Sequence, residues 1–231
     1  MCFHNSINTD KQSLEKKYKA KLKGEQKPIF HANAFEYQKW PIIPIKSEFI
    51  EQMNWGLIPS WADSPSKIQE IRSKTLNARI ETISEKPSFK NAKKCIVPST
   101  GFFEWQLVGN TKIPYFIFVP EMPIFSMAGL FDSHVNTQGE LVNTFSILTT
   151  EANSLMAEIH NTKKRMPVLL DQKQEQLWLN DELAAEELYV PFDSKKMKAY
   201  TIGNTISSKN HNSKEVNAPK VIQVSEQLNL F

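Results

Sequence analysis

Residues 114–131 read PYFIFVPEMPIFSMAGLF and hold two short apolar runs, at 114–119 and 124–131, rich in aromatic and β-branched residues. Runs of this length and composition are typical of β-strands. Similar runs lie outward from this stretch, at 95–98, 141–149, 166–170 and 199–206. Because these strands do not alternate regularly with helices, the sequence favours an α+β fold over a doubly wound sheet.

Helical patterns flank the strands. Apolar residues at helical spacing predict three helices, and capping residues precede the first two. They are 10–23 behind Asp10 or Ser13, 151–160 behind Thr149 or Thr150, and 172–188 around Trp178. Residues 68–71 predict one further helical turn. Prolines at 41, 44, 59 and 65 predict short extended pieces and turns between the first two helices.

The bulk composition is that of an ordinary globular protein. The chain has 231 residues, of which 40% are hydrophobic and 23% charged, enough for one domain with a core. No window approaches the roughly 20 apolar residues of a membrane span, and the N-terminus lacks the pattern of a signal peptide. We therefore expect a cytoplasmic protein. Lysine clusters at 11–27, 93–94, 163–165 and 195–198 indicate either solvated faces or a surface for an anionic ligand.

The two cysteines, Cys2 and Cys95, form no CxxC pair, which argues against a zinc ribbon or a thioredoxin-type site. We expect no metal and no cofactor. Cys95 lies in an apolar run and is expected to be buried and inert. Removal of Met1 would leave Cys2 with an α-amine and a thiol, whose pKa values of about 8 and 8.5 make both nucleophilic near neutral pH. Such a group captures aldehydes as a thiazolidine, or attacks an acyl carbon. Position alone favours the simpler interpretation, that Cys2 is an incidental residue.

Four further segments bear on that choice. They are NWGLIPSWA at 54–62, LNARIET at 76–82, CIVPSTGFFEW at 95–105, and IHN at 159–161 followed by RMPV at 165–168. In order and content, together with Cys2, they resemble the SRAP family, the SOS response-associated peptidases. The resemblance runs from Cys2 to about Asn217. It implies a single SRAP-type domain over 1–217, with mostly antiparallel sheets forming a barrel-like core flanked by helices, and a tail over 218–231.

The resemblance also implies a function. Family members cross-link covalently to abasic sites in single-stranded DNA through the processed N-terminal cysteine, here Cys2. By motif match, Asn77 would position the Cys2 amine, Glu104 would act as general acid and base during ring opening and Schiff-base formation, and His160 would move protons on the sugar. These are lyase-type steps of DNA repair in the SOS response. The resemblance also implies a nucleoid-associated monomer.

A second set of residues would hold the DNA. The resemblance places Arg79 on a phosphate beside the lesion and Trp55 and Trp61 in a loop against the strand, and Arg165 belongs to the same predicted surface. Aromatic stacking and arginine–phosphate contacts are how proteins hold single strands without reading sequence.

Each residue taken alone has a simpler interpretation. Glu104 could pair with a lysine at a strand edge, His160 could be structural, and Asn77 could lie in a turn. Either tryptophan could belong to the core. The joint occurrence of the motifs, rather than any one member, favours the functional interpretation.

The chain departs from the family at two places. Many members read Met-Cys-Gly-Arg, with the arginine on a DNA phosphate, whereas positions 3 and 4 here are Phe3 and His4. His4 would replace that contact weakly, because histidine is mostly neutral at pH 7. Around His160, the segment Thr162-Lys163-Lys164 is slightly longer than the common pattern, and its lysines could restore charge facing DNA.

The last residues are Gln227, Leu228, Asn229, Leu230 and Phe231. They resemble the short bacterial motif that binds the sliding clamp, in which a tail presents apolar side chains to a pocket. Alternatively, these residues pack back on the domain.

Two other classes of function stay open at this stage. One is a cysteine peptidase or amidase in which Cys2 attacks an acyl carbon, with self-removal of Met1 as its minimal form. The other is a non-catalytic module that binds single-stranded DNA through its tryptophans and lysine clusters.

Overall fold

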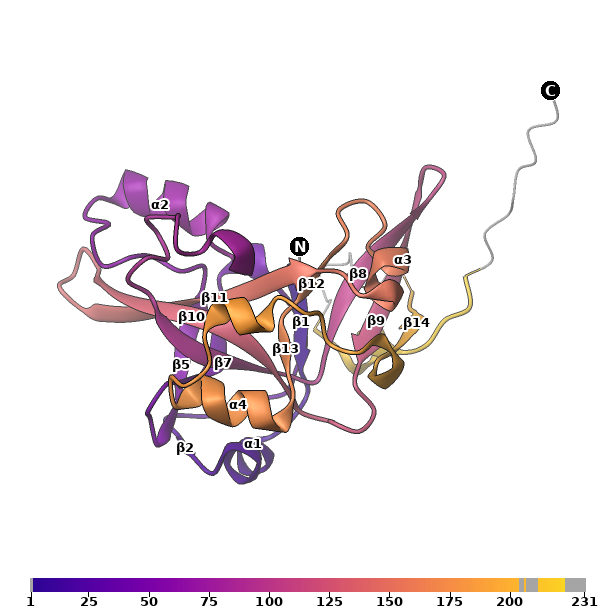
Figure 1. Cartoon of the computed structure of the whole chain (residues 1–231), viewed down its shortest axis with the longest axis horizontal. Helices are drawn as coiled ribbons and strands as arrows, with labels where there is room; N and C mark the ends of the chain where they lie inside the picture. The colour runs from indigo at the N-terminus through magenta and orange to yellow at the C-terminus, as the bar shows by residue number, and fades with distance from the viewer. Residues whose placement is uncertain (1, 204–205, 207–211, 223–231) are drawn as a thin grey trace.

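Two sheets, each mostly antiparallel, make up the computed structural model, which describes residues 2–203, 206 and 212–222 (Figure 1). The first sheet has, in spatial order, β14 (Lys198–Thr201), β9 (Thr111–Phe118), β8 (Gly101–Val108), β1 (His4–Ile7) and β3 (Ile29–Asn33). The second is built on β11 (Leu141–Glu151), β10 (Phe125–Val135), β7 (Lys93–Ser99), β4 (Lys39–Pro44) and β5 (Phe49–Trp55). Four short strands extend the second sheet: β2 (Lys21–Leu22), β6 (Asn77–Arg79), β12 (Arg165–Pro167) and β13 (Leu169–Leu170).

The five main strands of the second sheet close into a barrel. Neighbours pair antiparallel from β11 through β10, β7 and β4 to β5. β5 then pairs in parallel with β11, where Trp55 lies opposite Phe145. A closed ring with an odd number of strands needs one parallel pair, and this seam provides it. The prediction of an α+β fold with a barrel-like core is confirmed.

The two sheets join where β7 runs into β8. Ser99 ends β7, and its hydroxyl donates to Asn5 Oδ1 at 2.7 Å, while the backbone N–H of Gly101 donates back to it at 3.1 Å. The ring of Phe116 covers Gly101 so closely that a Cβ there would lie 2.0 Å from its Cζ. Any other residue at the start of β8 would therefore have to displace this ring.

The helices are shorter than predicted. α1 (Lys11–Tyr18) begins behind Asp10, which accepts from Ser13 N, but it ends because Lys19 is left-handed, with φ 51°. Leu22, predicted to lie in this helix, belongs instead to β2, which pairs with β5. α4 (Gln172–Leu179) has a full capping box from Asp171, with Trp178 buried. The predicted third helix stops there, and a separate 3-10 turn follows at Ala185–Leu188.

Two other predictions of local structure were also wrong in detail. α3 (Ser154–Ile159) is capped by Asn153, because Thr149 and Thr150 belong to β11. The helical turn at 68–71 is the centre of a full helix, α2 (Pro65–Lys74), with proline at its first position. That position leaves an amide unpaired in any helix, so proline costs nothing there.

The core fills the barrel, and a smaller apolar cluster of Phe103, Phe116, Ile202, Ile206 and Val216 forms beside the first sheet. Cys95 is fully buried, as predicted. Past the expected domain boundary at 217, Lys220 N still donates to Thr201 O at 2.9 Å. Among the described residues, the longest apolar helical stretch falls short of what crossing a membrane requires.

Candidate active site at the amino-terminal strand

Cys2 lies just before β1 and is fully buried. Its Sγ lies 3.7 Å from the carbonyl oxygen of His4, to which the thiol donates. Burial raises the pKa of the Cys2 thiol well above its usual range, and the negative charge of Glu104 raises it further. The thiol is therefore neutral at rest. Cys2 directly precedes β1, and β1 pairs with β8, the strand that carries Glu104.

Glu104 lies on β8, the strand that pairs with β1. Its side chain is 7% exposed. Burial raises its pKa to about 7, and the Trp105 backbone N–H and the charge of Lys163 oppose this rise. A carboxyl group with this pKa exchanges protons readily in both directions near neutral pH.

His160 ends α3 and faces Glu104. Its Nε2 lies 3.8 Å from Oε2 of Glu104, and its Nδ1 lies 2.8 Å from the carbonyl oxygen of Arg165. Since a carbonyl can only accept, Nδ1 carries the proton and the neutral ring turns the lone pair of Nε2 towards Glu104. Burial lowers the pKa of His160, so the neutral ring predominates at pH 7.

A pair of side chains holds the His160 segment against β8. Asn161 accepts from Leu107 N at 3.0 Å and donates to Leu107 O at 2.8 Å. One residue earlier on β8, Gln106 donates to the carbonyl of Glu158 at 3.3 Å. The turn is closed by Lys164 N donating to His160 O at 2.8 Å. These contacts fix the separation of Glu104 and His160.

Asn77 lies on β6, which pairs with β11. Its amide nitrogen and oxygen are both buried, and neither hydrogen-bonds to any residue in the described part of the chain. A buried amide left in this state is costly, so it marks a place where a reacting group is expected. No hydrogen bond within the described residues joins Asn77 to Cys2, Glu104 or His160.

Arg79 and Trp61 are the predicted DNA contacts that lie on the surface. Arg79 is exposed at the end of β6, two residues from Asn77. The Trp61 side chain is 42% exposed, with Lys67 Nζ 5.5 Å from its ring centre. Both are available to a ligand in solution.

Trp55 is not. It is fully buried, and its indole N–H donates to Leu76 O at 2.8 Å. The ring stacks on Phe145 with centroids 5.7 Å apart. The prediction that Trp55 contacts DNA is therefore wrong for this structure, because the residue is a core side chain at the parallel seam.

The prediction that Arg165 belongs to the DNA-binding surface is also corrected. Its guanidinium is buried and binds both oxygens of Glu81, at 2.7 and 2.9 Å, and the carbonyl of Thr149 at 2.6 Å. It therefore has a structural role, which is to hold β12 so that its own carbonyl meets His160. The Glu81 partner was not foreseen, although Glu81 lies in the quoted NARIET motif.

His4 is engaged with a residue that the sequence analysis missed. Its Nδ1 lies 2.8 Å from Nε2 of the buried His31, the two rings stack, and its edge meets Trp105. The sequence of β3, IFHAN, does not alternate and gives no sign that His31 is buried or that it pairs with His4. Lys163, which the sequence analysis considered only as charge facing DNA, also lowers the pKa values of both Glu104 and His160 through its positive charge.

The predicted clamp-binding residues 227–231 lie outside the described residues. Within the described part of the chain, no cluster of three or more potential metal ligands occurs.

The chain is similar to known proteins both in sequence and in fold. Residues 1–209 match the profile of the SOS response associated peptidase (SRAP) family. The chain is 36% identical over 202 residues to the abasic site processing protein YoaM of Bacillus subtilis, covering 84% of this chain and 86% of that protein. It is 39% identical to YoqW of the same organism, over 71% of this chain and 74% of that protein. A crystal structure of a protein from Bacteroides thetaiotaomicron superposes with a TM-score of 0.87 and 42% identity, covering 95% of this chain and all of that one.

Proposed function

Because this chain belongs to the SRAP family, we propose that it processes abasic sites in single-stranded DNA by cross-linking to them through Cys2. Its relatives YoaM and YoqW are named for abasic site processing. The observation that carries the proposal is the buried Glu104, with a pKa of about 7, set 3.8 Å from His160 and close enough to raise the Cys2 pKa. Such a protein would work with the nucleoid in the cytoplasm.

The first requirement is a free amine. Hydrolysis of the Met1–Cys2 peptide bond releases methionine and leaves the α-amine of Cys2. The amine adds to the C1′ aldehyde of the opened abasic sugar, and loss of water gives an imine. The thiol then adds across the C=N bond, so that sulfur bonds to C1′ and a proton reaches nitrogen. The product is a thiazolidine, with one water released for each cross-link.

Ring opening needs both an acid and a base, since an abasic deoxyribose is mostly a closed hemiacetal. Glu104 is divided between its two protonation states near pH 7, so it serves as proton donor or acceptor at successive steps. His160 offers the lone pair of Nε2 on the side that faces Glu104. As the C1′–O4′ bond breaks, one of the two groups takes the proton of the C1′ hydroxyl and the other gives a proton to the ring oxygen O4′. The pair therefore holds the same number of protons before and after the step.

The state of the thiol sets the order of events. Because burial and Glu104 keep the Cys2 thiol neutral, the amine reacts first and the thiol adds to the imine afterwards. Glu104 is the acceptor for the thiol proton, since the same charge that raises the thiol pKa attracts that proton. The unsatisfied amide of Asn77 supports a role in holding the amine or the sugar hydroxyl.

The proposed DNA-binding surface contains fewer of the predicted residues than the sequence indicated. Arg79 and Trp61 are exposed, and the charge of Lys163 acts on the Glu104–His160 pair. Arginine and lysine contact phosphates, and tryptophan stacks on unpaired bases. Trp55 and Arg165 are not part of this proposed surface.

The test is adduct formation with an abasic single-stranded oligonucleotide, by protein whose loss of Met1 has been verified by intact mass. We expect a band on denaturing gels whose mass is protein plus DNA minus one water. Cys2→Ala should form no thiazolidine, whereas Cys95→Ala, the matched buried control, should form the adduct. Cys2→Ser keeps the amine and should give only an imine, trapped by borohydride. If processed wild-type protein gives no adduct, the proposal is wrong.

Assays of the same processed protein also test the two other candidate functions. A cysteine peptidase would cleave peptide substrates, and a variant unable to use Cys2 would retain Met1 if removal is autocatalytic. Binding to single-stranded DNA without an adduct would indicate a non-catalytic module. The neutral Cys2 thiol favours the aldehyde reaction, because acyl attack needs a thiolate.

We further propose that residues 227–231 bind the sliding clamp. Deletion of these five residues should abolish clamp pull-down and leave cross-linking intact. Clamp binding that survives the deletion would contradict the proposal.

A further inference from the structure

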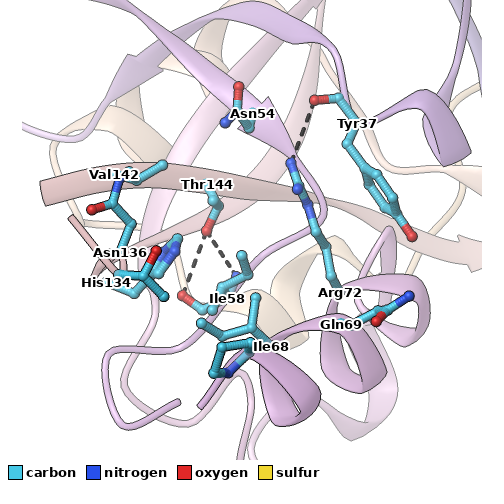
Figure 2. A pocket seen from close by; sticks show the side chains of 12 residues that line it. Tyr37, Asn54, Ile58, Ile68, Gln69, Arg72, His134, Asn136, Val142 and Thr144 are labelled. Atoms are coloured by element: carbon cyan, nitrogen blue, oxygen red, sulfur yellow. Dashed lines mark hydrogen bonds between the residues drawn. The ribbon is translucent and has the colours of Figure 1, made fainter. Parts of the chain in front are cut away.

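A cavity of about 380 Å³ lies beneath α2, away from Cys2. Its walls are α2, the end of β5 with the loop after it, and the β10–β11 hairpin (Figure 2). No residue of β1, β8 or α3 lines it. A cavity of this volume is within the range of small-molecule sites, and the Cys2 chemistry makes no use of it.

Arg72 supplies a positive charge to this cavity. The guanidinium carbon lies 4.1 Å from the Tyr37 ring centre, and Nη2 donates to Tyr37 O at 3.5 Å. Its Nε is buried and hydrogen-bonds to no described residue. Burial lowers its pKa. No aspartate or glutamate lines the cavity, so the lining contains no carboxylate to balance this charge.

The barrel fixes the position of Arg72. Gly56, at the end of β5, has φ +94°, and a Cβ there would lie 2.8 Å from Arg72 Cγ and 3.2 Å from Arg72 O. Any other residue at 56 would push the arginine stem away. The half-buried guanidinium is therefore a built feature of the fold, unlike a mobile surface arginine.

Polar and apolar groups divide the remaining lining. His134 on β10 is 5% exposed, and its Nδ1 hydrogen-bonds to no described residue. Burial and the Arg72 charge lower its pKa, against the opposing effects of Asp132 and the Val142 carbonyl, so the ring is neutral at pH 7. Ile58 and Ile68 face the same space from two different elements (Figure 2).

We propose that this cavity binds a nucleotide, with its phosphate at Arg72 and its flat base against Ile58 and Ile68. The guanidinium matches a phosphate in charge and geometry. Asn54 and Gln69 line the same cavity, and their amides offer the paired donor and acceptor that base edges need. The nucleotide is either free in solution or part of the DNA strand that the protein holds.

The test is calorimetric titration of the full chain with thymidine 5′-monophosphate, with thymidine and inorganic phosphate as half-ligands. We expect saturable 1:1 binding of the nucleotide and weaker binding of either half. Arg72→Gln should weaken binding about tenfold or more, as loss of a charge-assisted contact does. Ile68→Trp, which fills the cavity but keeps the charge, should abolish binding. Lys74→Gln makes the same charge change on the outer side of α2, where Lys74 pairs with Glu70, and should bind like wild type.

Thermal unfolding of each variant shows whether it is folded. An undamaged single-stranded oligonucleotide separates the two sources. If it displaces the mononucleotide, the cavity takes a nucleotide of the strand, and if both bind together, it takes a free one. The proposal is overturned if wild type shows no saturable binding, or if Arg72→Gln and Ile68→Trp both bind as wild type does. Cross-linking at Cys2 is a separate readout, so failure here leaves the proposed function untouched.

Discussion

Nε2 of His160 lies 3.8 Å from Oε2 of Glu104, and the two side chains are 8% and 7% exposed. A buried carboxyl group with a pKa of about 7 beside a neutral imidazole provides the acid and the base that hemiacetal opening requires. They come from different elements, α3 and β8, so their separation depends on how α3 packs on the first sheet. Several consequences of this arrangement can be measured.

Glu104 should make stability fall as pH rises. Burial raises its pKa from 4.5 to about 7, so between these values the folded state binds more protons than the unfolded state. The free energy of unfolding then decreases with pH, by at most about 3 kcal/mol. Glu104→Gln should remove this loss, and its advantage over wild type should grow between pH 5 and 8 in urea unfolding.

A matched control comes from Glu70, whose pKa is lowered by Lys74. Glu70→Gln should show no gain in stability at high pH. The cross-linking rate should also lose an inflection near pH 7 in Glu104→Gln. If the inflection persists in this variant, another group titrates in the reaction.

The two tryptophans of the NWGLIPSW motif should behave oppositely. Trp55→Ala should destabilise the fold by about 3–5 kcal/mol, as truncation of a buried aromatic does, because the ring packs at the barrel seam. Trp61→Ala removes an exposed ring and should weaken single-stranded DNA binding by about 1–3 kcal/mol with little change in stability. Chemical unfolding and fluorescence anisotropy with an undamaged oligonucleotide measure the two effects. Equal loss of DNA affinity in folded Trp55→Ala would contradict this division.

The motif identified the family, but it did not distinguish these two residues. The two tryptophans lie six positions apart in one segment. Trp55 is buried because β5 pairs in parallel with β11, a strand that is distant in sequence. The composition of the strands predicted the sheets, because short runs rich in aromatic and β-branched residues, such as 114–119, are typical of β-strands. The end of α1 was missed because Lys19 takes a left-handed conformation that glycine usually signals.

The sequence predicted the positions of some site residues and not of others. Glu104 and His160 lie 3.8 Å apart, and Cys2 precedes the strand that pairs with β8. The roles of these three residues stay predictions. Arg165 did not follow, because arginine in a motif indicates a charge without indicating its partner. Its partner Glu81 is far away in sequence, and only the fold brings the two together.

Arg165 and Arg79 therefore make a discriminating pair. Arg165→Gln removes the hydrogen bonds to the partly exposed Glu81 and to the Thr149 carbonyl, and should cost about 1–3 kcal/mol of stability. Arg79→Gln changes an exposed side chain and should leave stability within about 0.5 kcal/mol. Conversely, Arg79→Gln should reduce the salt dependence of DNA affinity by about one phosphate contact, measured as the slope of log affinity against log salt. An unchanged slope in Arg79→Gln would remove that residue from the DNA surface.

The separation of His160 from Glu104 should depend on Asn161, which touches neither group. Its amide bonds both backbone groups of Leu107, at 3.0 and 2.8 Å, and thereby ties the His160 turn to the strand that carries Glu104. Asn161→Ala removes two hydrogen bonds worth about 1 kcal/mol each. We expect a small loss of stability and a slower cross-linking rate, since small misplacements of catalytic groups reduce rates strongly. The pH inflection near 7 should stay, because Glu104 keeps its burial.

Thr162→Ala, an exposed change in the same turn, should leave both rate and stability unchanged. A rate in Asn161→Ala equal to that of Thr162→Ala would show that the reaction tolerates a mobile His160, and that the 3.8 Å approach to Glu104 is not needed for it.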